Sequence, residues 1–407
     1  MNDFAAELRQ RLDAIRAQGL YRELRQVDSP QSPHTRIAGQ ELLNFSSNDY
    51  LGLANHPHLN EAAIKAVERF GSGSGASRLI CGSLAPHHEL EAALAAFKNT
   101  EAALSFSSGY AAAVGTICAI AGKADVIVLD KLVHASIVDA ARLSGAKLRI
   151  FAHNDLNELD DILRWCNARS PTAPAAQPSR ILIVTESVFS MDGDLAPLRE
   201  IVNLKEKYGA WLMVDEAHAT GLFGEHRRGL AEELRLSERI EIQMGTLGKA
   251  LGSSGGYIAG ARSLIEYLIN RARTFIFSTA PVPAAAAAAR AAIELVQSPE
   301  GRERRDRLWA LVDQMKASLI QAGWPLIGIR SAITPLIIGG EAQAMEAAAT
   351  LRASGIYLPA VRYPTVARNQ ARLRLTMTAA HTPKDLCKLA TILPPPPRNP
   401  QPATPRA

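Results

Sequence analysis

Lys249 is the residue whose surroundings most favour covalent chemistry. It lies in the glycine-rich stretch GTLGKALGSSGG (Gly245 to Gly256), just after a short strand-like run. A lysine in an apolar, water-poor turn loses its charge more easily than a solvated one, and this favours imine formation with a carbonyl compound. A solvated surface lysine is the competing interpretation, so the residues that accompany Lys249 must decide between the two.

Asp215 and His218 are candidate partners of that lysine. Asp215 ends the apolar run WLMV, so its carboxylate is expected at the carboxyl edge of a buried strand, where open α/β sheets bind ligands. His218 follows in the same turn and could face the same ligand. A helix N-cap is the alternative role for this Asp. An imine-forming lysine and an acid that pairs with a pyridinium nitrogen are what pyridoxal phosphate requires, and the sequence supplies both.

Two further segments could complete a cofactor site. A phosphate needs backbone N–H donors at a helix start or in a nest, and Ser107 to Tyr110 (SSGY) ends one strand-like run and begins a helical one. Thr246 is a second candidate for the phosphate, and a plain turn with a helix cap is the alternative for SSGY. His134 comes just past another strand-like run and could lie flat on an aromatic cofactor ring, although an ordinary loop histidine would look the same.

Two nucleotide-binding motifs are approached but not met. A P-loop needs Gly five residues before its Gly-Lys pair and Ser or Thr after it, whereas Gln243 and Ala250 stand at these places. Gly71 to Ala76 matches a loose dinucleotide fingerprint, but it follows the helical pattern EAAIKAVERF instead of a strand. Neither motif supports a nucleotide site.

Strand-like and helical patterns alternate through the middle of the chain. Short, apolar, β-prone runs each precede a polar or Gly-rich turn: AALSFSSG, DVIVLD, KLRIFAHN, RILIVTES, WLMVDEAH and EIQMGTLG. Helical patterns such as APHHELEAALAAFK lie between them. This alternation predicts an α/β fold with a mostly parallel sheet and helices on both of its faces.

The two ends of the chain differ from the middle. Residues 1–50 are assigned to an N-terminal helical arm, because Phe4, Leu8, Leu12 and Ile15 recur at helical spacing and predict an amphipathic helix packed on the body. Residues 51–283 are predicted to form the large domain, and 284–393 a small C-terminal α+β domain. The proline-rich residues 394–407 are predicted to be disordered.

Composition argues against several other classes of protein. The net charge is +5 over 407 residues, but basic and acidic residues are interspersed, so no nucleic-acid partner is expected. No apolar run approaches the roughly 20 residues that span a bilayer, and no membrane association is expected. The four cysteines are scattered without a C-x-x-C pair, which favours a reduced, cytoplasmic protein without a metal site.

As a set, the motifs resemble the α-oxoamine synthases, a fold-type-I family of pyridoxal-phosphate enzymes. The likeness runs from about Asn44 to about His381 and is carried by NFSSNDYLGL, SRLICG, HHELE, FAHND, SVFSMDGD, VDEAHATG and TLGKALG. The resemblance implies a large domain with a mostly parallel sheet of seven strands, a small C-terminal α+β domain, and a homodimer.

The resemblance also implies roles around the cofactor. Lys249 would form the imine and transfer protons, Asp215 would face the pyridine nitrogen, and His218 would bind the phenolic oxygen. His134 would stack on the ring. The remaining implied cofactor contacts are Gly109, Tyr110, Ser190 and Thr246, together with Ser278 and Thr279 reaching a neighbouring subunit's phosphate.

On the substrate side, the resemblance assigns Asn48 and Arg374 to the amino acid and Arg22 and Thr365 to the acyl thioester. It is strongest to the branch that serves biotin biosynthesis by condensing L-alanine with a pimeloyl thioester of coenzyme A or acyl carrier protein. A glycine-using member of the family and a non-catalytic scaffold subunit are the alternatives. Ala367 stands where many relatives have proline, so a local loop difference is expected there.

Overall fold

The computed structural model describes residues 3–168, 179–326 and 328–397. These residues form two compact units. We call residues 48–190 and 194–307 the sheet unit, and residues 3–47, 191–193 and 308–397 the terminal unit, each apart from the gaps just given. The units divide after residue 307, inside a helix, whereas the sequence predicts a domain boundary at Pro283; that boundary stays a prediction.

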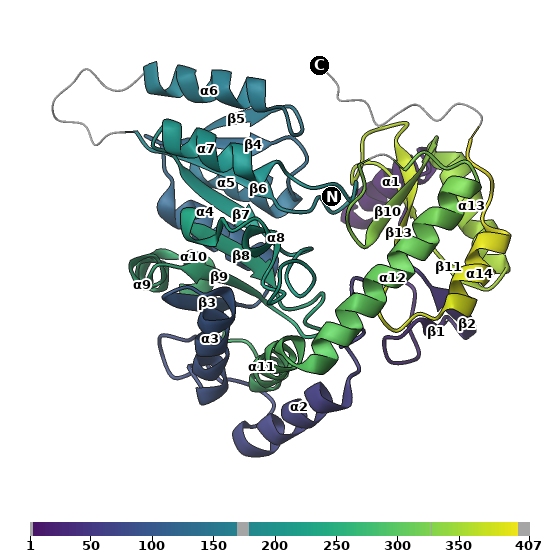
Figure 1. The fold of residues 1–407 in the computed structure, drawn as a ribbon, viewed down its shortest axis with the longest axis horizontal. Helices are drawn as coiled ribbons and strands as arrows, with labels where there is room; N and C mark the ends of the chain where they lie inside the picture. The colour runs from purple at the N-terminus through teal and green to yellow at the C-terminus, as the bar shows by residue number, and fades with distance from the viewer. Residues whose placement is uncertain (1–2, 169–178, 327, 398–407) are drawn as a thin grey trace. The chain divides into compact units, whose positions relative to one another are not determined.

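The sheet unit is built on a seven-stranded sheet with the order β3-β9-β8-β7-β6-β4-β5 (Figure 1). Its strands are β3 (Ala102–Phe106), β4 (Val126–Asp130), β5 (Lys147–Phe151), β6 (Ile181–Glu186), β7 (Trp211–Asp215), β8 (Ile242–Thr246) and β9 (Gly256–Gly260). From β5 to β8 all neighbours are parallel, and only β9 runs antiparallel to β8 and β3. The predicted mostly parallel sheet is therefore confirmed.

Helices cover both faces of this sheet, as the alternation predicts. Alternate strand residues such as Leu104, Ile127, Leu129, Met213 and Ile258 form one core with helices α4, α5, α9 and α10. Helices α3, α6 and α7 also pack on the strands. The helices of this unit are α2 (Pro57–Phe70), α3 (Ala85–Lys98), α4 (Gly109–Ile120), α5 (Ala135–Ser144), α6 (Leu156–Ala168), α7 (Leu198–Lys207), α8 (Leu230–Glu233), α9 (Arg262–Arg271), α10 (Arg273–Ile276) and α11 (Pro283–Gln297), with a short 3₁₀ turn at Ser237–Arg239.

The terminal unit contains two small sheets and the helices beside them. One sheet has the order β1-β2-β11 and the other β10-β13-β12. Its elements are α1 (Phe4–Ala17), β1 (His34–Ile37), β2 (Gln40–Asn44), β10 (Ile333–Gly339), α13 (Glu341–Ala353), β11 (Ile356–Tyr357), β12 (Ala360–Val361), β13 (Ala371–Thr376) and α14 (Pro383–Ile392). Helix α12 (Pro299–Gln321) begins in the sheet unit and continues into this one.

The N-terminal helix forms where the sequence predicts it, but the expectation that it packs on the body is wrong for the single chain. Asp3 caps α1 by accepting from the Ala5 N–H, and none of the helix residues is buried. Phe4 is 74% exposed, and Leu8 and Ile15 are also exposed. A helical apolar pattern shows which side chains share a face and does not show that this chain covers that face.

Two further sequence expectations concern the proline-rich tail and membrane association. Of the proline-rich tail, residues 398–407 lie outside the described residues. Within the described ranges, no helix is long and apolar enough to cross a membrane.

Candidate active site

Two carboxyl groups end neighbouring parallel strands of the sheet unit. Glu186 closes β6 and Asp215 closes β7, and the two residues are register partners. Both are buried. Burial raises the pKa of Asp215, although the charge of Lys249 opposes the rise. Burial and the charge of Asp215 raise the pKa of Glu186 to about 8. One carboxyl of this pair can therefore stay protonated at neutral pH while the other carries charge.

A chain of hydrogen bonds connects Lys249 to the loop after β2. Lys249 Nζ lies 2.7 Å from His218 Nε2, and His218 Nδ1 lies 2.5 Å from the Tyr50 hydroxyl. The Tyr50 hydroxyl donates to Asn48 Oδ1 at 3.4 Å. If the lysine donates to Nε2, then Nδ1–H donates to Tyr50 and Tyr50 donates onward, so every link has one donor and one acceptor. Three of the predicted residues, Asn48, His218 and Lys249, thus lie in one network.

His134 belongs to the same part of the sheet unit. It caps α5, with its Nδ1 accepting from the Ser136 N–H at 3.2 Å. Burial lowers the pKa of His134, while the charge of Asp215 opposes this and that of Lys249 adds to it. The imidazole is therefore mainly neutral at physiological pH.

The start of α4 carries the residues that the sequence predicts to cradle a phosphate. Ser108 caps the helix by accepting from the Ala111 N–H at 3.0 Å. A Cβ built on Gly109 would lie 3.9 Å from Thr246 Cβ, and a Cβ built on Gly256 would lie 2.6 Å from the Gly109 backbone. The helix start therefore lies against the ends of β8 and β9, and the absence of a side chain at Gly256 permits the approach. Tyr110 is half exposed, and its hydroxyl donates to Asp139 at 2.9 Å.

A buried ion pair supports the loop that follows Asp215. Lys98 Nζ lies 2.6 Å from Glu216 Oε2, and these side chains are only 1% and 0% exposed. The other carboxylate oxygen accepts from the Ala231 N–H at 2.9 Å. Glu216 is the next residue after Asp215, so this pair holds the backbone from which the predicted acid projects.

The remaining predicted cofactor residues lie in two loops of the same unit. Ser190 is half-buried in the loop after β6, where the Ser187 N–H donates to the Asp215 carbonyl at 2.9 Å. Ser278 and Thr279 follow α10, and Thr279 forms an isolated bridge with Ser77. Their contact with a second subunit stays a prediction.

The other predicted substrate residues belong to the terminal unit. Arg374 is buried on β13, and its guanidinium donates to Thr376 Oγ1 at 3.0 Å. Arg22 donates to Thr365 Oγ1 at 3.4 Å, so the two residues assigned to the acyl side lie together. Their roles towards substrate stay predictions.

The sequence reasoning missed three residues of this site. Tyr50 stands inside the quoted motif NFSSNDYLGL, and Glu186 ends a strand-like run just as Asp215 does. The strand-end position was the signal that could have found Glu186. Lys98 had no such signal, because it closes an ordinary amphipathic helix far from Glu216 in sequence.

The residues present fit pyridoxal phosphate on chemical grounds. A capped helix start beside glycines suits a phosphate. A buried acid at a strand end suits a pyridinium nitrogen, and a half-buried lysine hydrogen-bonded to a histidine suits an aldehyde. These three features occur within one unit, on the ends of β3, β7 and β8.

Comparison with known proteins identifies the family. The model of the family described as aminotransferase class I and II matches residues 40–393. The chain belongs to this family. Among curated relatives, 8-amino-7-oxononanoate synthase of Geotalea daltonii is 49% identical over 94% of this chain and 95% of that protein. The enzyme of the same name from Geobacter sulfurreducens is 49% identical over 92% of this chain and 94% of its own length.

Solved structures agree with this assignment. Serine palmitoyltransferase from Sphingomonas wittichii has a TM-score of 0.87 and 32% identity, and covers 96% of both chains. A serine palmitoyltransferase variant from S. paucimobilis with bound pyridoxal phosphate has a TM-score of 0.88 at 30% identity, covering 96% of this chain and 97% of that chain. 8-Amino-7-oxononanoate synthase from Francisella tularensis has a TM-score of 0.72 and 28% identity, over 86% of this chain and 96% of that one. The resemblance to the α-oxoamine synthases and the predicted fold-type-I transferase fold are confirmed.

Proposed function

We propose that this chain catalyses the 8-amino-7-oxononanoate synthase reaction, the decarboxylative condensation of L-alanine with a pimeloyl thioester in biotin biosynthesis. Relatives with that name match nearly the whole chain. The observation that carries the proposal is the network joining Lys249 and His218 beside the buried Asp215. It offers the imine lysine and the ring-nitrogen acid of a pyridoxal-phosphate enzyme in one place.

Each residue around the cofactor has a distinct task in this proposal. Bound pyridoxal phosphate would accept the electron pair left at Cα of the amino acid. Asp215 would keep the proton on the pyridine nitrogen, and His218 would hydrogen-bond the phenolic oxygen. His134 would stack on the ring. Lys249 would hold the cofactor, and its amine would take the Cα proton of alanine.

Four further residues of the sheet unit are assigned to contacts with the cofactor. The start of α4 at Gly109 and Tyr110 supplies backbone donors, and Ser190 and Thr246 supply hydroxyls. Cα of alanine forms a bond to the acyl carbon as the thiol leaves. The carboxyl group of alanine then leaves as carbon dioxide, and one proton returns to Cα to give the amino ketone.

Substrate contacts are assigned to residues with suitable donors. The Arg374 guanidinium can bind the alanine carboxylate through two parallel hydrogen bonds, with Asn48 beside the amino acid. Arg22 and Thr365 are assigned to the acyl side, where the distal carboxylate of a pimeloyl group needs a cation or a polar exit. The acyl carrier is coenzyme A or an acyl carrier protein in this proposal, and the location is the cytoplasm.

A homodimer completes the proposed site. Leu79, Ile80 and Phe277 expose large apolar surfaces, and Phe277 is 69% exposed. The bridge between Ser77 and Thr279 brings these two segments side by side. An apolar surface of this kind supports a contact between subunits, and Ser278 and Thr279 on it would reach the partner's cofactor phosphate.

A product assay tests the proposal against the glycine-using alternative. We expect kcat/KM to be higher for alanine with pimeloyl-coenzyme A than for glycine with acetyl-coenzyme A. A better rate for glycine with acetyl-coenzyme A would assign the chain to the other branch. Comparing pimeloyl-coenzyme A with pimeloyl-acyl carrier protein in the same assay identifies the carrier.

A further inference from the structure

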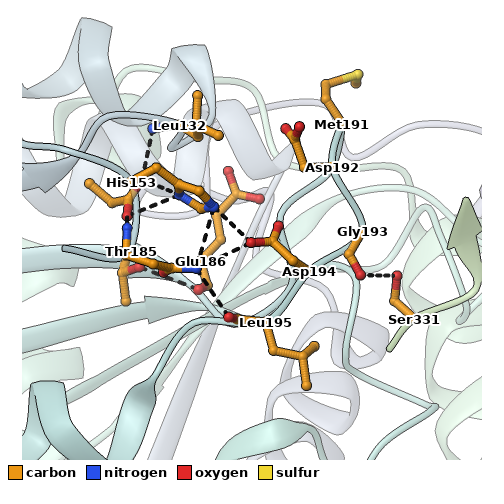
Figure 2. Close-up of polar contacts among 12 residues, drawn as sticks. Leu132, His153, Thr185, Glu186, Met191, Asp192, Gly193, Asp194, Leu195 and Ser331 are labelled. Carbon is orange, nitrogen blue, oxygen red and sulfur yellow. Dashed lines mark hydrogen bonds and ion pairs between the residues drawn. The ribbon is translucent and has the colours of Figure 1, made fainter. Parts of the chain in front are cut away.

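His153 takes no part in the site described so far, yet it bridges two loops of the sheet unit. It follows β5 in the segment FAHND. Its Nδ1 lies 3.0 Å from Asp130 Oδ1. Its Nε2 lies 2.7 Å from Asp194 Oδ2, a contact that is drawn in Figure 2. Only 22% of its side chain is exposed.

Two carboxylates can be satisfied by this imidazole only when both ring nitrogens carry a proton, because a neutral imidazole donates from one nitrogen alone. Burial acts to lower the pKa of His153, but the hydrogen bonds to Asp130 and Asp194 and their charges outweigh it and raise the pKa to about 10. His153 is therefore an imidazolium at neutral pH. Both carboxylates form ion pairs with this ring.

The Asp130 side of the bridge leads to the predicted stacking histidine. Asp130 closes β4, and its Oδ1 also accepts from the Leu132 N–H at 2.8 Å. Its Oδ2 accepts from the Asn154 N–H at 2.9 Å. The turn that Asp130 holds in this way runs directly into His134.

The Asp194 side leads to the loop that carries Ser190. The Phe189 N–H donates to the Asp194 carbonyl at 3.0 Å, which closes the loop on itself. Asn154 Nδ2 donates to Asp194 Oδ2 and to the Leu195 carbonyl, both at 3.2 Å. The Phe189 ring meets the His153 ring edge to face, with centroids 4.3 Å apart. His153 and Asn154 thus connect the loop that carries Ser190 to the end of β4.

We propose that His153 is a positioning residue of the pyridoxal-phosphate site, which fixes the turn before His134 relative to the loop that carries Ser190. It acts through those two residues and touches no reacting atom. The inference rests on the proposed cofactor and deepens the proposed function. It does not depend on which amino acid or thioester reacts.

The test is the holoenzyme with His153→Gln, a neutral side chain whose N–H donors are both on one nitrogen instead of on opposite sides of a charged ring. We expect the dissociation constant for pyridoxal phosphate to rise about tenfold, by analogy with outer partners that orient the ligands of metal sites. Loss of ring orientation should also weaken the visible circular dichroism of the bound cofactor. Turnover should fall by up to about 100-fold, as displacements of about 1 Å at reacting groups can do, while KM for alanine changes little.

His226→Gln is the matched control, because His226 Nδ1 contacts one carboxylate, that of Glu232, at 2.6 Å in the same unit and the side chain is half exposed. It should leave all four readouts unchanged. Asp194→Asn is the second variant, since it removes one carboxylate and keeps the histidine. It should shift the four readouts in the same direction as His153→Gln. It also provides the test if His153→Gln does not fold.

The proposal would be overturned if the variants had the cofactor affinity and visible circular dichroism of the wild type and only a lower melting temperature. His153 would then be purely structural. Failure of the proposed function would look different. The wild type would then make no product from alanine and pimeloyl thioester, while the cofactor readouts would still report on His153.

Discussion

Replacing Lys98 by methionine tests how far the loop after Asp215 depends on a buried ion pair. The Lys98 ammonium contacts Glu216 at 2.6 Å and donates to the Arg228 carbonyl at 2.5 Å. Burial acts to lower the pKa of Lys98, but the charge of Glu216 and its hydrogen bond, together with the charges of Tyr257 and Glu232, outweigh it, and the pKa lies above its ordinary value. The pair is therefore ionic at neutral pH, and both charges rely on each other.

In Lys98→Met the Glu216 carboxylate stays buried without its counter-charge. Removing one partner of such a pair typically lowers the free energy of unfolding by about 3–5 kcal/mol. Glu216→Gln leaves the lysine ammonium buried in turn. The double variant carries neither charge, and the Gln carbonyl can still accept from the Ala231 N–H, so its loss should be smaller than the sum of the two single losses.

Urea denaturation of the four proteins at saturating cofactor, followed by far-ultraviolet circular dichroism, measures these losses. Lys65→Met is the control, because Lys65 pairs with Glu61 on the surface with 69% and 62% of the side chains exposed, and exposed pairs contribute little. It should show no measurable change. A Lys98→Met loss as small as that of the control, or strictly additive losses in the double variant, would refute the reasoning.

Four other changes have expected outcomes. Lys249→Ala should abolish the visible absorbance of lysine-bound cofactor and turnover with the fold intact; a borohydride-trappable link at another lysine would contradict this. Asp215→Asn should retain cofactor binding but slow turnover by orders of magnitude, since a neutral amide does not keep the ring nitrogen protonated; near-normal turnover would mean that the wrong acid was chosen. Gly256→Ala should raise the dissociation constant for pyridoxal phosphate measured by titration, because its Cβ would strike the Gly109 backbone. The difference in melting temperature between wild type and His153→Gln should be largest below about pH 6.5 and should disappear as the pH rises through about 10. The reason is that folding raises the pKa of His153 from its ordinary value of 6.5 to about 10. A difference that does not change with pH would argue against an imidazolium.

Strand ends were the part of the site that the sequence could predict. Asp215 and Lys249 each follow a short apolar run, and the carboxyl ends of parallel strands meet at one edge of the sheet. Strand β9 was not predicted, because its sequence GYIAG begins and ends with glycine and continues a glycine-rich turn. Its two glycines face the Gly109 backbone and the Glu241 carbonyl, contacts that no single-strand pattern reveals.

Long-range partners were the part that the sequence could not predict. Tyr50 and His218 are 168 residues apart, and Lys98 and Glu216 are 118 apart, so no local period joins them. For α1 the helix was predicted correctly from the spacing of its apolar residues, but the burial of its apolar face was not. The spacing of Leu8 and Leu12 reports a shared face, whereas burial of that face depends on whatever covers it.

His153 shows why a motif can be visible while its chemistry is not. FAHND was among the segments that carry the family resemblance, and a lone histidine in it would be neutral above its ordinary pKa. Its charge is set by carboxylates that lie 23 and 41 residues away in sequence. They reach it only because β4 lies between β5 and β6 in the sheet. The strand order therefore decides the protonation state of this residue, and through it the loop that carries Ser190. A sheet with the same strands in another order would leave the same sequence without the bridge.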